Sequence, residues 1–368
     1  MKMPDITIKN AIPEDNSQLI ELSKQCPMDG DIKAYIDRNP DFSKIYQIFD
    51  NPILLVSKSQ KEIAGCLGAT HQDVIVNNSI YEMAAWGDFK VSPSYRGTRV
   101  AIDMLEELYN IELQSNTKFA VVSILRGNKK SLSFTKGKGK IPKAQALDDY
   151  VFYSILPFGK KKINKDYKIA NANENNLDEM ALLYNHYYEQ YNLSPRYTID
   201  SLQELIKNLP GLKLSDFLLV RKNRKLVACL ARWDQQRLQR YVVTEFSGKI
   251  KLLTTSYTLL KPFFEMPAAP QKGNTLRFVF LSFLALRNND RHAFDNLIKA
   301  CHNSLIGQNY AFYNICLREK DPLGNMLKKY ISTKVYTHNF AFSTTYNKNI
   351  TDFKLTQKPV HIEYSTFI

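Results

Sequence analysis

An internal repeat constrains the fold of this 368-residue chain more than any other feature. Residues 54–67 read as an apolar strand, a polar turn and a second apolar strand, and residues 218–230 repeat that pattern. Two further matches follow the same order along the chain: residues 8–11 with 169–172, and residues 121–126 with 313–318. Three ordered matches are typical of a duplicated unit and predict two similar domains.

Each unit is expected to run as strand, one or two helices, antiparallel strands, helix, strand, helix and final strands. This order predicts an α+β fold in which each domain has a mixed, mostly antiparallel central sheet flanked by helices. An insertion rich in lysine and proline is expected at about residues 249–273. We divide the chain into a first domain (1–157), a linker (158–165), a second domain (166–345) and a C-terminal tail (346–368).

The apolar periodicity assigns secondary structure to ranges of the chain. The strands expected in the first unit lie near residues 5–12, 52–58, 62–76, 79–91, 118–125 and 148–156. Its helices are expected near residues 14–25, 31–38, 99–115 and 128–136. The helices expected in the second unit lie near residues 175–191, 199–208, 290–305 and 322–330.

The composition is that of an ordinary globular protein, with 44% hydrophobic and 23% charged residues. We find no apolar stretch long enough to cross a bilayer and no signal-peptide core, so we expect a soluble, cytoplasmic protein without membrane contacts. The 5 cysteines form no CxxC pair, which fits buried free thiols in a reducing compartment. The 6 histidines are dispersed, and we expect no metal.

The net charge of +14 is unevenly distributed. Residues 1–157 hold 19 basic and 19 acidic side chains, whereas the remainder holds 31 and 17. Within the first unit, residues 90–143 carry 11 basic and 4 acidic side chains. Such a basic region fits a phosphate-bearing ligand, and an ordinary solvated surface is the alternative explanation.

The region around residue 97 has the features of an anion site. A strand is expected to end at Val91, Pro93 and Gly97 shape a turn, and a helix begins near Arg99. A helix start presents unpaired amides and a partial positive charge, and glycine lets the backbone approach an anion closely. Arg96 adds positive charge. The alternative is an ordinary strand–turn–helix junction.

This stretch resembles the acetyl-CoA motif of the GNAT N-acetyltransferase superfamily, V-x-P-x-x-R-G-x-G-x-G/A. Arg99 departs from that motif, which usually has glycine at this position. The matching residues are Val91, Pro93, Arg96, Gly97 and Ala101. The cofactor-binding residues that the resemblance implies here are Phe89, Val91, Arg96, Gly97, Thr98, Arg99, Val100 and Ala101.

A second segment, residues 128–139, resembles the N-x-x-A-x-x-L-Y-x-x-x-G element of the same superfamily. The resemblance implies that Asn128, Ser131 and Phe134 flank the pantetheine arm of the cofactor. Thr135 replaces the tyrosine that often protonates the leaving thiolate in the family.

The corresponding junction of the second unit, residues 287–292, contains neither glycine nor proline. Asp290 is expected to cap the following helix, and its carboxylate would compete with a phosphate for the same amides. We therefore expect the second unit to be a degenerate copy that does not bind CoA in the family manner.

Two carboxylates near the loop are candidate catalytic bases, Glu82 and Asp88. Alternation along the strand places both on one face, opposite Ala85 and Gly87, unless a bulge shifts the register. The alternative is catalysis by positioning, with backbone donors and water. His71, Tyr81 and Trp86 are candidate walls of the pocket.

The resemblance implies an N-acyltransferase that moves an acetyl group from acetyl-CoA to an amine acceptor. Two other functions stay open: a non-catalytic CoA-binding sensor or scaffold, and nucleic-acid binding through the basic second half. The last is least favoured, because that half lacks a recognised reading motif. The acceptor, the acyl chain length and the oligomeric state are not determined by the sequence.

Overall fold

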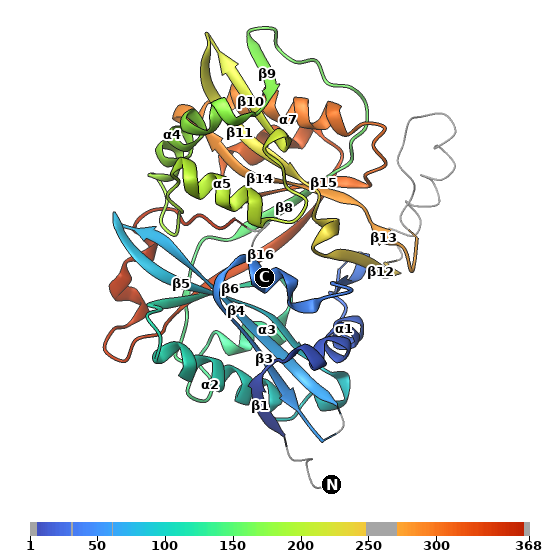
Figure 1. Ribbon diagram of the computed structural model, residues 1–368, viewed down its shortest axis with the longest axis vertical. Coiled ribbons are helices and arrows are strands. Elements are labelled where there is room, and N and C mark those ends of the chain that lie inside the picture. Colours follow the sequence, from blue (N-terminus) through green and yellow to red (C-terminus); the bar gives the residue numbers. More distant parts are fainter. Residues whose placement is uncertain (1–5, 31, 61, 248–270, 364–368) are drawn as a thin grey trace.

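The structure, a computed structural model, describes residues 6–30, 32–60, 62–247 and 271–363 (Figure 1). Most of the expected insertion at 249–273 lies outside these residues. No helix in the described ranges has the length and apolar character needed to span a membrane.

Two lobes, one from each half of the chain, lie one above the other in Figure 1. The helices of the first half are α1 (Asn16–Gln25), α2 (Val100–Leu113) and α3 (Lys129–Phe134). The helices described in the second half are α4 (Leu177–Tyr188), α5 (Ile199–Asn208) and α7 (Arg291–Leu305). The first-half strands are β1 (Thr7–Asn10), β2 (Ile32–Asp37), β3 (Asp50–Lys58), β4 (Ile63–Val76), β5 (Ser79–Val91), β6 (Phe119–Leu125), β7 (Gln145–Ala146) and β8 (Tyr150–Ile155). The second-half strands are β9 (Tyr167–Asn171), β10 (Phe217–Lys222), β11 (Lys225–Trp233), β12 (Arg240–Phe246), β13 (Thr275–Leu276), β14 (Phe278–Leu286), β15 (Phe312–Arg318) and β16 (Ser332–Ser343).

The strands show that the two halves repeat one topology. In the first half β1, β3, β4 and β5 pair antiparallel in that order, and β5 then pairs parallel with β6. In the second half β9, β10, β11 and β14 pair antiparallel in order, and β14 pairs parallel with β15. The expected α+β class, with a large and mostly antiparallel sheet flanked by helices, is confirmed.

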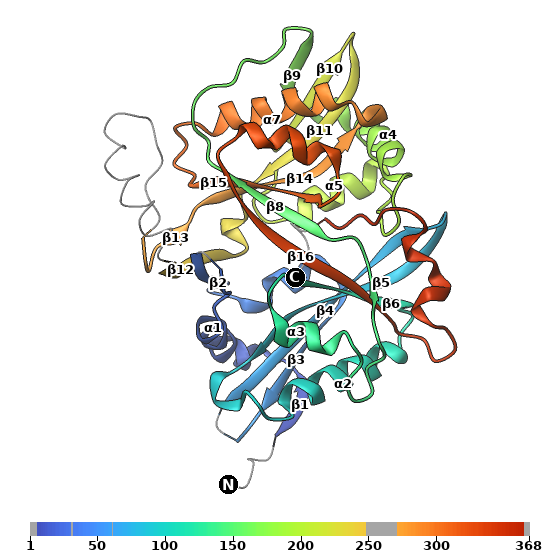
Figure 2. The same cartoon turned by 180° about the vertical axis from the view of Figure 1, so that it is seen from behind.

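The final strands of the two halves are exchanged. β8, from the first half, pairs with β15 of the second half, and β16, from the second half, pairs with β6 of the first. β8 and β16 also pair with each other, which joins both halves into one 13-stranded sheet in the described chain. Figure 2 shows these two strands crossing the molecule between the lobes. The predicted boundary near residue 157 is therefore not a boundary between separate sheets.

Local sequence accounts for the long hairpins. β4 and β5 are joined at Asn77 and Asn78, which both have positive φ (49° and 70°), as a type I′ hairpin turn requires. Asn223 and Arg224 play the same part between β10 and β11, with φ of 50° and 66°. The hairpin repeated in the sequence, β3–β4 and β10–β11, is therefore recognised by its apolar strands and not by a shared asparagine turn.

Two expectations about local structure need correction. The helix expected at 31–38 is strand β2, which pairs with β12 of the second half in a small separate sheet. Its strand conformation depends on β12, which lies more than 200 residues away along the chain, so local periodicity was misleading. The helix expected at 322–330 is a 3₁₀ helix, Pro322–Lys329. The predicted linker is fixed against α7, where Asn303 Oδ1 accepts from the amide of Lys161 at 2.7 Å.

We predict that residues 1–157 do not fold alone. Without β16, β6 loses the seven residues that pair with it, and the apolar side chains Ala341 and Phe342 that cover it are missing. The exposed edge and apolar surface should cause aggregation. Co-expression with residues 158–368 should restore a soluble complex, measured by size-exclusion chromatography and circular dichroism. A monomeric 1–157 fragment that unfolds cooperatively would contradict the exchanged arrangement.

Candidate functional site

A wedge opens between the parallel strands β5 and β6. Their pairing ends at Trp86 and Val122, although β5 continues to Val91. Beyond that point β5 stays paired with β4 but contains a bulge, since the register shifts between Gly87 and Lys90. The bulged residue Asp88 has φ of +51°. A bulge leaves main-chain groups outside the ladders, so this end of β5 can offer backbone donors to a ligand.

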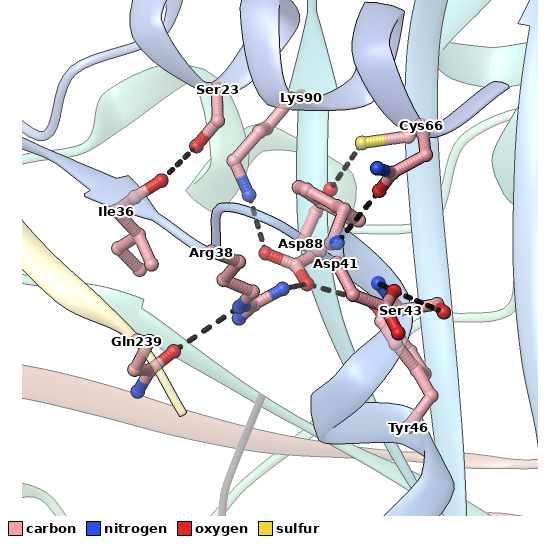
Figure 3. A network of polar contacts seen from close by, with 12 residues as sticks. Ser23, Ile36, Arg38, Asp41, Ser43, Tyr46, Cys66, Asp88, Lys90 and Gln239 are labelled. Atoms are coloured by element: carbon pink, nitrogen blue, oxygen red, sulfur yellow. Dashed lines mark hydrogen bonds and ion pairs between the residues drawn. The ribbon is translucent and has the colours of Figure 1, made fainter. Parts of the chain in front are cut away.

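The Asp88 carboxylate holds the bulge through a buried network of polar groups (Figure 3). It forms ion pairs with Arg38 and Lys90, and it accepts a hydrogen bond from the Tyr46 hydroxyl at 2.8 Å. The side chains of Arg38 and Asp88 are only 2% and 3% exposed. Arg38 Nε also donates to Gln239 Oε1 at 3.2 Å, which connects the bulge to the second half.

This network defines the role of Asp88. Although burial acts to raise the pKa of its carboxyl, the attraction of Arg38 and Lys90 prevails and lowers the pKa well below its ordinary value. A carboxylate held in this way is a weak proton acceptor, which disfavours the catalytic role predicted for Asp88. The sequence did not decide whether β5 contains a bulge. The bulge is present, so Glu82 and Asp88 do not follow simple alternation.

The position of Tyr46 requires glycine on the neighbouring strand. Gly68 of β4 lies opposite Gly87, and a Cβ added at Gly68 would collide with the Tyr46 ring and hydroxyl. The packed Tyr46, itself 3% exposed, therefore fixes the hydrogen bond to Asp88.

The loop after β5 presents an open helix start. Gly97 has φ of +86°, and nothing lies within 4 Å of a Cβ built there, so its surface is free for a ligand. The helix α2 begins at Val100, and Arg99, the residue before it, provides no side-chain cap. Arg99 extends along the helix to Asp103, with its Nη2 3.1 Å from the carboxylate. Arg99 stands where the family motif has glycine, and its guanidinium thus points away from the amides at the start of α2.

The amides at this helix start are available to an anion. The first main-chain bond runs from the amide of Asp103 to the Arg99 carbonyl, at 2.9 Å. Thr98 Oγ1 accepts from the amide of Val100 at 3.3 Å. Among the described residues, the amides of Arg99, Ala101 and Ile102 face no acceptor. Arg96 lies earlier in the same loop, and its Nε donates to the Val91 carbonyl at 3.3 Å.

Helix α3 closes the other side of the wedge. Phe134 packs edge-on against Phe89 of β5, with ring centroids 5.7 Å apart, so two predicted cofactor residues lie together. Asn128 caps α3 by accepting from the amide of Ser131 at 3.2 Å. Thr135 donates to the Leu132 carbonyl at 2.9 Å, so its hydroxyl is committed to its own helix.

A polar cluster lies under the wedge on the side of α2. Glu112 is fully buried and accepts from Trp86 Nε1 at 3.2 Å, while His71 Nε2 lies 3.2 Å from the same oxygen. Burial acts to lower the pKa of His71, but the bond to Glu112 and its charge raise it overall. His71 and Trp86 therefore belong to a charged interior cluster.

Glu82 lies at the other end of β5, away from the loop. It accepts from Thr117 Oγ1 at 3.0 Å. Its carboxyl lines a cleft of about 520 Å³ between the two halves, which also contains carboxylates of both halves. The acidic residues in its wall are Asp50, Asp73, Glu82, Glu204 and Glu363. Glu82 is five residues from Gly87, about 16 Å along an extended strand, so it does not reach the bulge.

Sequence reasoning missed the partners of Asp88. Arg38, Tyr46 and Gln239 come from three distant segments, and no motif marks them. A charged residue directly after the apolar run of β5 was the only signal that a buried partner is needed. In the part of the chain that the structure describes, no cluster of three or more His, Cys, Asp and Glu side chains is suited to a metal.

Comparison with known proteins identifies the fold. No family model matches the sequence, and no curated protein matches it either. A solved structure of Saccharomyces cerevisiae N-myristoyltransferase with bound myristoyl-CoA superposes with a TM-score of 0.62 at 10% identity, covering 98% of this chain and 86% of that one. A second structure of that enzyme with myristoyl-CoA gives 0.60 at 10% identity, covering 93% and 85%. The chain therefore has a GNAT-like fold that extends over nearly its whole length.

We predict that Asp88→Asn lowers the free energy of unfolding by about 3–5 kcal/mol at pH 7, because two buried cations lose their partner. Since folding lowers the pKa of Asp88, its contribution is complete above the unfolded-state pKa of about 3.9 and decreases as the pH falls below it. The difference between wild type and variant should therefore shrink on acidification, measured by urea unfolding at pH 7 and pH 3.

The control is Glu245→Gln, which breaks the exposed ion pair with Lys33 and should leave the free energy of unfolding nearly unchanged, because solvent screens that pair. A wild-type advantage over Asp88→Asn that stays constant down to pH 3 would show that the Asp88 charge is not what stabilises the centre.

Proposed function

We propose that the protein is an N-acyltransferase that moves an acetyl group from acetyl-CoA to an amine acceptor. The observation that carries the proposal is the arrangement in the first half. A wedge between parallel strands, a bulged β5 and an uncapped helix start follow one another in the order in which the thioester, pantetheine and pyrophosphate of CoA would lie. The general acyltransferase fold of the structural neighbours agrees with it.

The pyrophosphate would bind at the start of α2. Amides of Arg99, Ala101 and Ile102 supply donors, and the helix dipole favours negative charge there. The Thr98 and Val100 backbone shapes the same turn. Arg99 neutralises Asp103, whose charge would otherwise oppose a phosphate. Gly97 allows the phosphates to approach the backbone closely.

The pantetheine arm would lie between the end of β5 and α3. Phe89 and Val91 would form one wall, and Asn128, Ser131 and Phe134 the other. The contact between Phe89 and Phe134 then closes the wedge when no ligand separates the rings. This assignment uses the residues that the family resemblance implies, and the contact between Phe89 and Phe134 supports it.

In the proposed reaction, the lone pair of a neutral amine attacks the thioester carbonyl carbon. The C–S bond then breaks, CoA leaves as a thiolate, and the amine proton passes to water. The main-chain amide of the bulged residue Asp88 would stabilise the negative oxygen of the intermediate. Because Asp88 is engaged and Thr135 donates within its helix, catalysis would rest mainly on positioning and backbone donors.

The core beneath the wedge favours a short acyl group. Trp86 stacks on Phe342 with centroids 5.6 Å apart, and the buried Glu112 carboxylate lies on the same side. A long alkyl chain entering there would have to displace the stacked rings and contact a charge, at a high desolvation cost. We therefore propose acetyl transfer, although the structural neighbours contain myristoyl-CoA.

The cleft between the halves would receive the acceptor. Its five carboxylates are balanced by one arginine, Arg196, although the chain as a whole carries +14. Such a wall favours a cationic amine. Glu82 was a candidate base from the sequence. Because it lies far from the bulge, we assign it instead to binding the positive charge of the acceptor.

Binding of the cofactor is tested at Gly97. Gly97→Glu places a carboxylate beside the proposed pyrophosphate and should weaken acetyl-CoA binding by about thirty-fold, roughly 2 kcal/mol. The measurement is thermal-shift stabilisation and calorimetric affinity. Gly159→Glu is the matched control, since Gly159 also has positive φ (72°) and open space around its Cβ. Equal binding by both variants would remove this loop from the proposed site.

Transfer is tested by CoA thiol release with a panel of amines. We expect release with cationic amines and, for Glu82→Gln, a KM about ten-fold higher at unchanged kcat, as the loss of a charge-assisted contact implies. Glu107→Gln, on the exposed face of α2, should behave as wild type. A fall in kcat at unchanged KM would instead make Glu82 a base. CoA binding without thiol release from any amine would support the sensor alternative.

A further inference from the structure

We propose that the second half is a self-occupied counterpart of the acyl-CoA site. In it, two carboxylates of the chain itself bind main-chain amides. Glu363 binds the amide that corresponds to the one assigned to the thioester in the first half. Asp290 binds the amides that correspond to those assigned to the pyrophosphate. The identification of the displaced ligand as CoA rests on the proposed function. The binding of these amides by Glu363 and Asp290 rests on contacts within the chain.

The second half contains a matching wedge. β14 and β15 pair parallel from Phe278 to Leu281, and their pairing then ends although β14 continues to Leu286. As in β5, a register shift follows on the antiparallel side of the strand. Phe283 has φ of +55° at this bulge, the counterpart of Asp88 with +51°. The two wedges therefore share strand order, pairing and backbone distortion.

The bulge amide of the second wedge has a partner. The Phe283 amide donates to Glu363 Oε2 at 2.7 Å, a contact that spans 80 residues. A carboxylate oxygen is a negative acceptor at the place where the first half would stabilise the oxygen of a thioester intermediate. Glu363 thus supplies the charge that a reacting ligand would supply.

The segment before Glu363 is fixed in the wedge by its main chain. Tyr150 donates to the Val360 carbonyl at 2.6 Å and accepts from the amide of Ile362 at 3.1 Å. The amide of His361 donates to the Asn192 carbonyl at 2.8 Å, and its ring packs on Tyr188 with centroids 4.5 Å apart. Only about 50 Å³ remains open between these groups and the two strands, too little for a pantetheine arm.

The helix start of the second half is also occupied. Asp290 Oδ1 accepts from the amides of His292 and Ala293, at 2.9 and 3.0 Å. In the first half, Arg99 stands at the equivalent cap position and accepts nothing through its side chain. The second half has therefore kept both sets of anion-binding amides and filled each with an internal carboxylate.

The proposal predicts one CoA site in the wild-type chain and a second, weaker one once both carboxylates are removed. Calorimetry with CoA is run at concentrations that leave a first-half site weakened about thirty-fold by Gly97→Glu unoccupied. It should then give one equivalent for wild type, none detectable for Gly97→Glu, and one again for Gly97→Glu combined with Asp290→Ala and Glu363→Ala. The control replaces Asp178 and Asp200, exposed carboxylates in the first turns of α4 and α5, with alanine in the Gly97→Glu background, and should bind none.

A second measurement does not depend on CoA. Hydrogen exchange at the Phe283 amide should be at least ten-fold faster in Glu363→Ala than in wild type, whereas Glu363→Gln, which retains an acceptor oxygen, should stay near wild type. Unchanged exchange in Glu363→Ala, or a folded triple variant that binds no CoA, would overturn the proposal. If wild type binds no CoA while exchange accelerates as expected, the function assigned to the first half fails and the internal occupancy stands.

Discussion

The buried carboxylate of Asp88 is the interaction on which the centre of the molecule depends. It sits at a bulge with positive φ, a conformation that costs free energy for a residue other than glycine. Two cations and a phenol hold it there, and Arg38 continues to Gln239 in the second half. The same contacts therefore keep the wedge of the first half open and fix that half against the other.

The network also has an electrostatic consequence for the wedge. One carboxylate faces two cations, Arg38 and Lys90, which leaves a surplus positive charge in a buried region beside the bulge amides. A positive environment with preorganised donors stabilises a developing oxyanion more than it stabilises a neutral carbonyl. Asp88 thus contributes to the proposed chemistry by fixing the geometry of the bulge and by partly neutralising Arg38 and Lys90. It does not itself accept a proton.

The sequence predicted what depends on neighbours along the chain. The duplicated hairpins were found because their apolar strands and polar turns are local, and the loop at Gly97 because its residues are consecutive. Strand β2 was mistaken for a helix, and the exchange of β8 with β16 was missed, because both depend on partners in the other half. The partners of Asp88 were missed for the same reason. Asp290 was expected to cap α7, which is confirmed, but the contact of Glu363 with Phe283 spans 80 residues and had no local signal.

Strand exchange explains how the two halves can diverge without separating. β6 is covered by β16, and β15 by β8, so neither half completes its sheet without the other. Selection on the fold therefore maintains the second half even when its wedge binds no ligand. Amides at a bulge or a helix start still need acceptors once they are shielded from water. In the proposed function that need is left to a ligand in the first half, whereas in the second half it is met by Glu363 and Asp290. On this proposal, the physical difference between the two halves is that the first leaves these amides free for a ligand and the second binds them with its own carboxylates.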